Sequence, residues 1–103
     1  MQSNGFGVEV EHLDGTVTLR PSGELDLATA PLLERALDGV LQGGHAVVLD
    51  LSGLTFADCA GLEPIRWARQ RRTSDRIRVV GARPPVERVL TLTGLQEPLN
   101  VES

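Results

Sequence analysis

Residues 47–62 read VVLDLSGLTFADCAGL, and this stretch decides how the rest of the chain is organised. Its apolar run, 47–49, is typical of a strand that is covered on both faces. Asp50 closes the run, and a short loop follows with a turn at 52–53. Asp58 then stands where a helix needs an N-cap, because its carboxylate can accept hydrogen bonds from free backbone N–H groups and its charge suits the helix dipole. The stretch therefore predicts a strand, a loop and a helix start.

The loop and the helix start carry apolar and small side chains. Leu54 and Phe56 are expected to anchor the loop to the core, whereas Cys59, Ala60 and Gly61 are small. Small residues leave the amide groups of a helix N-terminus open to approach by another protein or an anion. We therefore predict a docking surface at this turn.

A hairpin is predicted ahead of this unit. Alternating residues over 8–13, the turn signal Asp14-Gly15 and the run 16–19 indicate two antiparallel strands. Pro21 is expected to end or bulge the second strand, because proline cannot donate to a sheet ladder.

Two helices flank the predicted central strand. Residues 29–41 have apolar side chains at helical spacing, with Pro31 in the first turn and a glycine stop at 43–44. The second helix is expected to run from about 59 to 73. Pro64 conflicts with a regular start, because it would delete a backbone hydrogen bond, so we expect a distorted first turn or a later beginning.

The remaining pattern adds a strand over 77–80, a third helix over 86–93 and a tail at 99–101 along the sheet edge. Alternating strands and helices predict an α/β sandwich, with a mixed sheet of four to five strands and about three helices mainly on one face. We expect one domain over 1–103, in which 1–7 are loosely held.

Composition excludes several classes of protein. The net charge of −4 and the isoelectric point near 5.0 argue against nucleic-acid binding, which needs a basic surface. One cysteine cannot form an internal disulfide, which fits a reducing compartment. The chain shows neither an apolar run of membrane-spanning length nor the basic and apolar regions of a signal peptide, so we expect a cytoplasmic protein.

Two short motifs carry a family resemblance. Gly-Glu-Leu-Asp stands at 23–26, and Asp-Cys-Ala-Gly-Leu stands at 58–62. In this order, with the predicted strands and helices, they resemble the STAS domains, and within them the anti-sigma factor antagonists of bacteria, whose second motif reads Asp-Ser-Ser-Gly-Leu. The resemblance covers nearly the whole chain, and the STAS fold agrees with the predicted architecture.

The resemblance implies binding to an anti-sigma factor, often itself a serine-protein kinase of the ATP-binding type, so that a sigma factor is freed for transcription. In the family, phosphate on the second serine of the motif adds negative charge to this surface and repels the partner. The residues expected to contact the partner are Gly23, Glu24, Asp26, Thr55, Phe56, Asp58, Cys59, Ala60, Gly61 and Leu62.

This chain departs from the family pattern at the phosphorylated position. Ala60 occupies it and Cys59 precedes it, so neither side chain offers a hydroxyl group. The protein is then a constitutively unphosphorylated antagonist, or uses another hydroxyl, of which Ser52 and Thr55 lie nearest, or serves as a scaffold or transporter-associated binding module outside sigma regulation. We favour the first hypothesis.

Several residues admit a purely structural interpretation. Asp58 could cap a helix without any partner, Asp26 could cap the first helix, and Cys59 is expected to be a small buried residue rather than a redox sensor. The arginines at 66, 69, 71 and 72 are expected to form a solvated helix face. Trp67 is either a partner anchor or a flank of the core.

Catalysis is not expected. Asp50 superficially matches the phosphoacceptor aspartate of receiver domains, but that chemistry needs further acids around Mg²⁺ and a lysine, and the chain has no lysine. His12 and His45 are isolated in sequence, without metal-binding spacing. Glycine-rich phosphate motifs are absent. We therefore predict no enzyme activity, no cofactor and no metal site.

Overall fold

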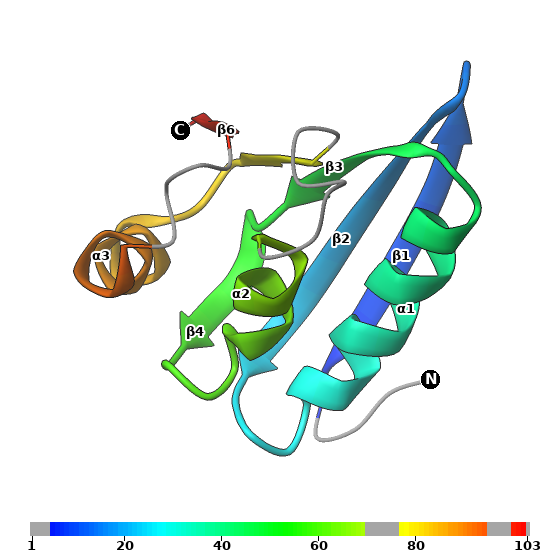
Figure 1. Ribbon diagram of the computed structural model, residues 1–103. Helices are drawn as coiled ribbons and strands as arrows, with labels where there is room; N and C mark the ends of the chain where they lie inside the picture. Colours follow the sequence, from blue (N-terminus) through cyan, green and yellow to red (C-terminus); the bar gives the residue numbers. More distant parts are fainter. Residues whose placement is uncertain (1–4, 70–76, 95–99, 103) are drawn as a thin grey trace.

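The computed structural model describes residues 5–69, 77–94 and 100–102, which form one sheet with three helices (Figure 1). Along the chain the elements are β1 (Gly7–Leu13), β2 (Thr16–Leu25), α1 (Ala30–Gln42), β3 (Ala46–Asp50), β4 (Gly53–Ala57), α2 (Glu63–Arg69), β5 (Ile77–Val80), α3 (Pro84–Thr93) and β6 (Asn100–Glu102).

The sheet is mixed, as predicted. Its strand order is β1-β2-β3-β5-β6, and β4 pairs with β2 beside this path. β1 is antiparallel to β2, whereas the other pairs are parallel. β4 lies where a loop was predicted, and β6 forms the expected edge segment around Val101, while Leu99 lies outside the described residues.

Pro21 sits where β2 changes its parallel partner. Residues 16–19 of β2 pair with β3, and residues 22–25 pair with β4. Pro21 is opposite Val8 of β1 and falls between the two parallel ladders. Because the N–H group that proline lacks falls at this gap, neither parallel ladder loses a hydrogen bond. The predicted strand end at Pro21 is therefore wrong, and the irregularity in register lies between Gly23 and Glu24.

The first two helices begin and end for identifiable reasons. α1 has proline in its first turn and buries Leu33 and Leu37, in agreement with the predicted helix. Its C-cap, Gly43, is right-handed, and the left-handed residue expected there is Gly44, with φ of 80°. α2 begins at Glu63 rather than near Cys59, as the position of Pro64 predicted. The predicted end of this helix near residue 73 lies outside the described residues.

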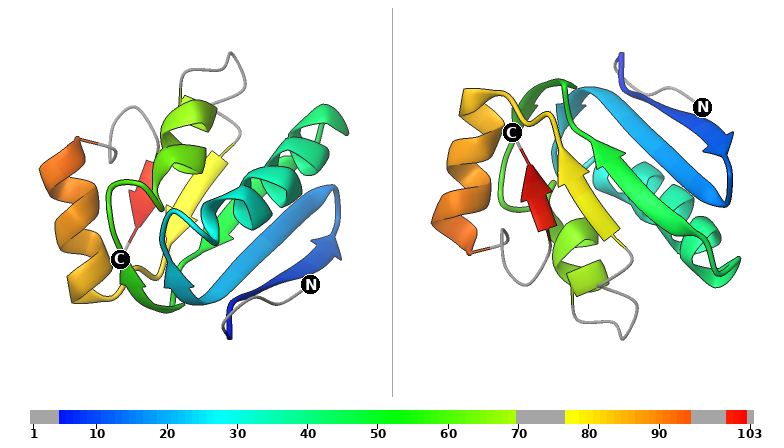
Figure 2. Two further views of the ribbon diagram at one scale, coloured as in Figure 1. Left: turned by 90° about the horizontal axis from the view of Figure 1, so that it is seen from below. Right: turned by 90° about the horizontal axis from the view of Figure 1, so that it is seen from above.

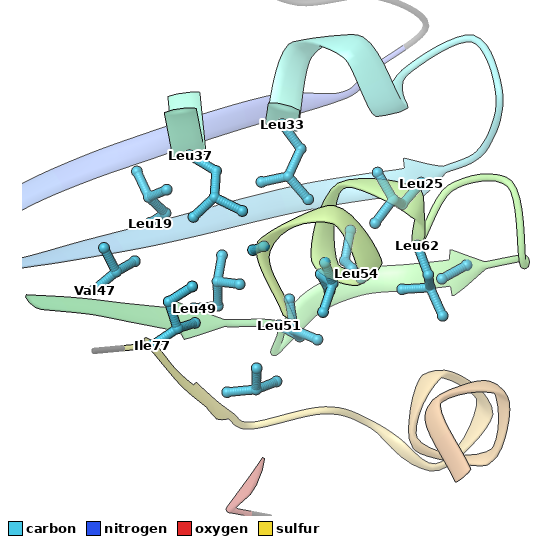
Figure 3. Close-up of a cluster of buried hydrophobic side chains, with 14 of the residues drawn as sticks. Leu19, Leu25, Leu33, Leu37, Val47, Leu49, Leu51, Leu54, Leu62 and Ile77 are labelled. Atoms are coloured by element: carbon cyan, nitrogen blue, oxygen red, sulfur yellow. The ribbon is translucent and has the colours of Figure 1, made fainter. Parts of the chain in front are cut away.

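A layer of leucine, isoleucine and valine side chains joins α1 and α2 to the sheet (Figure 3). Leu33 and Leu37 of α1 point toward Leu19 of β2 and Leu49 of β3, and all four are fully buried. α1 and α2 lie on one face of the sheet, while α3 packs beside β4 (Figures 1 and 2). The carboxyl ends of β2 and β4 therefore lie together, next to the beginnings of α1 and α2.

Candidate protein-binding site

The two sequence motifs meet at the ends of β2 and β4. Leu25 is in register with Ala57, and the backbone N–H of Asp58 donates to the carbonyl of Leu25 at 3.3 Å. The turn that leaves β2 therefore lies beside the turn that leaves β4, at the lower edge of the sheet in Figure 1. We call these turns, residues 24–29 and 55–62, the motif surface.

Gly61 locks the two turns together. A β-carbon at Gly61 would overlap the carbonyl group of Leu25 and would lie 2.8 Å from the backbone nitrogen of Asp26. The close approach of the two backbones therefore requires glycine at this position. The φ angle of Gly61 gives no further reason, since it is not in the left-handed region. The packing fixes the shape of the motif surface.

Asp58 makes the expected cap hydrogen bond, although the turn that it caps precedes the regular helix. Its Oδ1 accepts a hydrogen bond from the Gly61 N–H at 2.8 Å, and its carbonyl accepts one from the Leu62 N–H at 3.1 Å. The Glu63 N–H donates to the carbonyl of Ala60 at 3.3 Å. Asp58 thus organises a single turn that leads into α2.

Asp26 organises the neighbouring turn in a similar way. Its Oδ1 accepts hydrogen bonds from the N–H groups of Ala28 at 3.0 Å and Thr29 at 3.1 Å. The Thr29 hydroxyl donates to the carbonyl of Glu24 at 2.8 Å and accepts from the Asp26 N–H at 2.9 Å. The prediction that Asp26 could cap the first helix is therefore wrong. These bonds close the turn ahead of α1, and the N-cap residue of α1 is Thr29. Glu24 is exposed beside this turn.

Exposed apolar groups accompany the acids on the motif surface. Leu27 is 77% exposed, Phe56 is 46% exposed, and the thiol of Cys59 is exposed. Phe56 is therefore not the core anchor that was predicted, since only Leu54 takes that role, and the expectation of a buried Cys59 is wrong. Leu27 was not among the residues predicted to contact a partner. A leucine directly after Gly-Glu-Leu-Asp, ahead of the predicted helix, was a usable signal of an exposed apolar contact.

The hydroxyl groups near the motif surface differ in access. Ser52 is half-buried, and its backbone N–H donates to Asp50 Oδ1 at 3.0 Å. Thr55 is exposed, and its hydroxyl donates to the carbonyl of Gly23 at 3.2 Å. Ala60 is half-buried in the capped turn. Among the two alternative positions considered from the sequence, Thr55 is the more accessible to another protein.

Asp50 is a structural residue that links β2 and β3. Its Oδ2 accepts a hydrogen bond from Arg20 Nε at 3.0 Å, and its Oδ1 accepts one from the Ser52 N–H at 3.0 Å. Burial raises the pKa of Asp50, but the hydrogen bonds from Ser52 and from Arg20 outweigh it, so the pKa lies below its ordinary value. The pKa of Arg20 is raised, chiefly by its hydrogen bond to Asp50. Asp50 therefore has a structural role.

His12 and His45, isolated in sequence, meet in the structure. Their ring centroids lie 5.9 Å apart in an edge-to-face arrangement, at the end of the sheet where β1 and β3 approach the hairpin turn. Among the described residues, no group of three or more histidine, cysteine, aspartate or glutamate side chains could hold a metal ion. The described helices also include none that is long and apolar enough to cross a membrane.

Comparison with known proteins agrees with the two motifs and the fold. The family model of the STAS domain matches residues 7–103. An anti-sigma F factor antagonist of Paenibacillus polymyxa is 34% identical over 92 residues, which cover 85% of this chain and 79% of that protein.

Solved structures of similar shape include an anti-sigma factor antagonist from Mycobacterium paratuberculosis. It has a TM-score of 0.82 and 30% identity, over 94% of this chain and 85% of its own. The anti-sigma factor antagonist SpoIIAA, in its unphosphorylated form, has a TM-score of 0.73 and 22% identity, over 94% of this chain and 88% of its own, a level of identity that shows the fold alone. The chain belongs to the STAS domain family.

Proposed function

We propose that this protein is an anti-sigma factor antagonist, which binds an anti-sigma factor through the motif surface and thereby frees a sigma factor for transcription. The observation that carries the proposal is the junction of the two motif turns through Gly61 and Leu25, which presents acids and exposed apolar side chains together. The similarity to anti-sigma factor antagonists of two other bacteria supports it. The protein acts by binding rather than by catalysis, in the cytoplasm where bacterial transcription takes place.

The chemistry of the motif surface defines what it can bind. Asp58, Glu24 and Asp26 supply carboxylates, while Leu27 and Phe56 supply apolar area. Such a surface suits a partner that offers apolar groups framed by cationic side chains, because buried apolar contact gives affinity and charge complementarity gives orientation. The rigid hydrogen bonding of both turns reduces the entropy that is lost on binding.

The partner in this proposal is an anti-sigma factor of the ATP-binding serine-kinase type, and the complex is not switched by phosphorylation at Ala60. An alanine side chain cannot accept a phosphoryl group, and Cys59 offers a thiol in place of the preceding hydroxyl. The negative charge that would repel the partner therefore does not arise at positions 59 and 60. The protein then antagonises its partner whenever it is expressed, and its abundance sets its effect.

The experiment that tests the proposal is affinity capture from a lysate of the host, with the wild type, Asp58→Arg and Glu87→Arg as baits. Glu87 lies in the first turn of α3, outside the residues that define the motif surface, and receives the same cation. We expect the wild type and Glu87→Arg to recover an anti-sigma factor with an ATP-binding kinase fold, and Asp58→Arg to recover none. Recovery of transporter subunits, or of partners that are indifferent to Asp58→Arg, would favour a scaffold module instead.

A further inference from the structure

A groove separates α1 from α2 on the helical face of the molecule. Its volume is about 310 Å³, and its walls are made by Pro31, Glu34, Arg35, Asp38 and Trp67. Four of these residues come from α1, and Trp67 comes from α2. The groove therefore combines an indole ring with two carboxylates and one guanidinium group.

Trp67 takes part in both the core and the groove. Its side chain is half-buried and packs against the hydrophobic core, and it also lines the groove. An indole ring held in this way needs no reordering before a cation or a planar group stacks on it. The structure thus confirms that Trp67 flanks the core and shows it in the wall of the groove, while its role as a partner anchor stays a prediction.

The acids of the groove favour a cation as its occupant. Glu34 and Asp38 are four residues apart on α1 and so share one helix face. Asp38 already accepts a hydrogen bond from Gln42 Nε2 at 3.0 Å, which holds its carboxylate in place. With two carboxylates against the guanidinium of Arg35, the described lining of the groove has a net negative charge. An arginine suits it better than a lysine, because a guanidinium group can stack on indole and bind carboxylates in one plane.

One end of the groove lies next to the motif surface. Pro31 is the second residue of α1, directly after the turn that Asp26 organises, and α2 follows the turn that Asp58 caps. From Pro31 the groove extends along α1 to Asp38, a helical rise of about 10 Å. A partner seated on the motif surface could therefore place one of its side chains in the groove.

We propose that the groove receives an arginine side chain of the anti-sigma factor, as an extension of the interface at the motif surface. This inference rests on the proposed function for the identity of the partner, but the chemistry of the groove is testable without it. The groove also supplies a contact outside the motif turns. Within those turns, the chain has Cys59 and Ala60 in place of the family's two serines.

The first test uses a small probe, N-acetyl-arginine amide, with its neutral analogue N-acetyl-citrulline amide as the control ligand. The chain has one tryptophan, so the indole N–H of Trp67 gives a single signal in nitrogen-correlated NMR spectra. We expect the arginine probe to shift this signal saturably in the millimolar range. Glu34→Gln/Asp38→Asn should weaken its binding at least about fivefold, whereas Asp14→Asn/Glu87→Gln, which makes the same change in net charge outside the groove, should not.

The second test uses the anti-sigma factor recovered by affinity capture. We expect Glu34→Gln/Asp38→Asn to weaken its binding about tenfold, and the control pair to leave it unchanged. Equal shifts with the citrulline probe, stronger binding of N-acetyl-aspartate amide, or an unchanged affinity for the anti-sigma factor would overturn the inference. If no anti-sigma factor is recovered, the proposed function fails, and the probe experiment still decides whether the groove binds a guanidinium group.

Discussion

Gly61 and Leu25 pack backbone against backbone, so closely that no β-carbon fits between them. The contact joins two segments that are far apart in the sequence, and it sets the Asp58 turn against the Asp26 turn. Since the contact is made within the fold, the shape of the motif surface exists before any partner arrives. This preformed surface is the physical basis of the proposed binding function.

Gly61→Ala should destabilise the fold. The added β-carbon must displace the carbonyl group of Leu25, and overpacking of this kind costs at least about 2 kcal/mol in the free energy of unfolding. Gly39→Ala is the matched control, because a β-carbon there meets nothing within 4 Å and the residue lies inside α1. That control should gain about 0.5–1 kcal/mol. Urea unfolding of the two variants gives both values, and equal stability of the two would refute the packing argument.

Asp50→Asn should change how stability depends on pH. The native pKa of Asp50 is lowered, so its ionised form stabilises the fold. The contribution is fully present above the ordinary carboxyl pKa of about 3.9 and is lost as the pH falls through the lower native value. The difference in free energy of unfolding between the wild type and Asp50→Asn should therefore be constant from neutral pH to about pH 5 and should shrink below about pH 4. A difference that stays constant down to about pH 2 would show that the ionised carboxylate is not the stabilising group.

The thiol of Cys59 should react in the native state. It is exposed, and it is the chain's one cysteine, so a disulfide reagent such as dithionitrobenzoate should modify one thiol per chain without denaturant. The bulky anionic adduct lies on the motif surface and should block partner binding while circular dichroism remains unchanged. Cys59→Ser should resist the reagent, so its affinity for the partner should be the same before and after the treatment. Binding that survives complete modification of the thiol would place the interface elsewhere.

The sequence predicted the architecture better than the local geometry of the site. Hydrophobic periodicity and the position of Pro64 were enough to predict α1 and the late start of α2, because both depend on neighbouring residues. The role of Pro21 depended on which strands pair with β2 on either side of it, and that pairing is non-local. The exposure of Phe56 followed from the same cause, since Gly53–Ala57 becomes a strand only by pairing with β2.

The candidate site likewise combines local features, which could be predicted from the sequence, with contacts between distant segments, which could not. The cap hydrogen bond of Asp58 spans three residues and could be predicted from spacing. The meeting of Gly61 with Leu25, the contact between His12 and His45 and the groove beside Trp67 each join distant segments. Such contacts follow from the topology of the sheet and the packing of helices on it, which short motifs do not contain.

Ala60→Ser should create a phosphorylation switch if the partner is a kinase. The substitution restores a hydroxyl at the position that the family phosphorylates, in a turn whose backbone is already fixed by Asp58. Incubation with the captured anti-sigma factor and ATP should add one phosphate to Ala60→Ser and none to the wild type at this turn, as read by mass spectrometry. Binding of the variant should then fall with time, while that of the wild type persists. Phosphorylation of the wild type at Ser52 or Thr55 with loss of binding would instead support an alternative hydroxyl.

The most direct test of the account is calorimetric titration of the captured anti-sigma factor with the wild type, Asp58→Asn and Asp58→Arg, in the presence of ATP. Asparagine keeps the cap hydrogen bond to Gly61 and removes the charge, whereas arginine removes the cap, at a cost of about 1 kcal/mol, and reverses the charge. We expect tight binding by the wild type that does not decay with ATP, weaker binding by Asp58→Asn and none by Asp58→Arg. Equal affinity of all three proteins would contradict the assignment of the motif surface as the site where an anti-sigma factor binds.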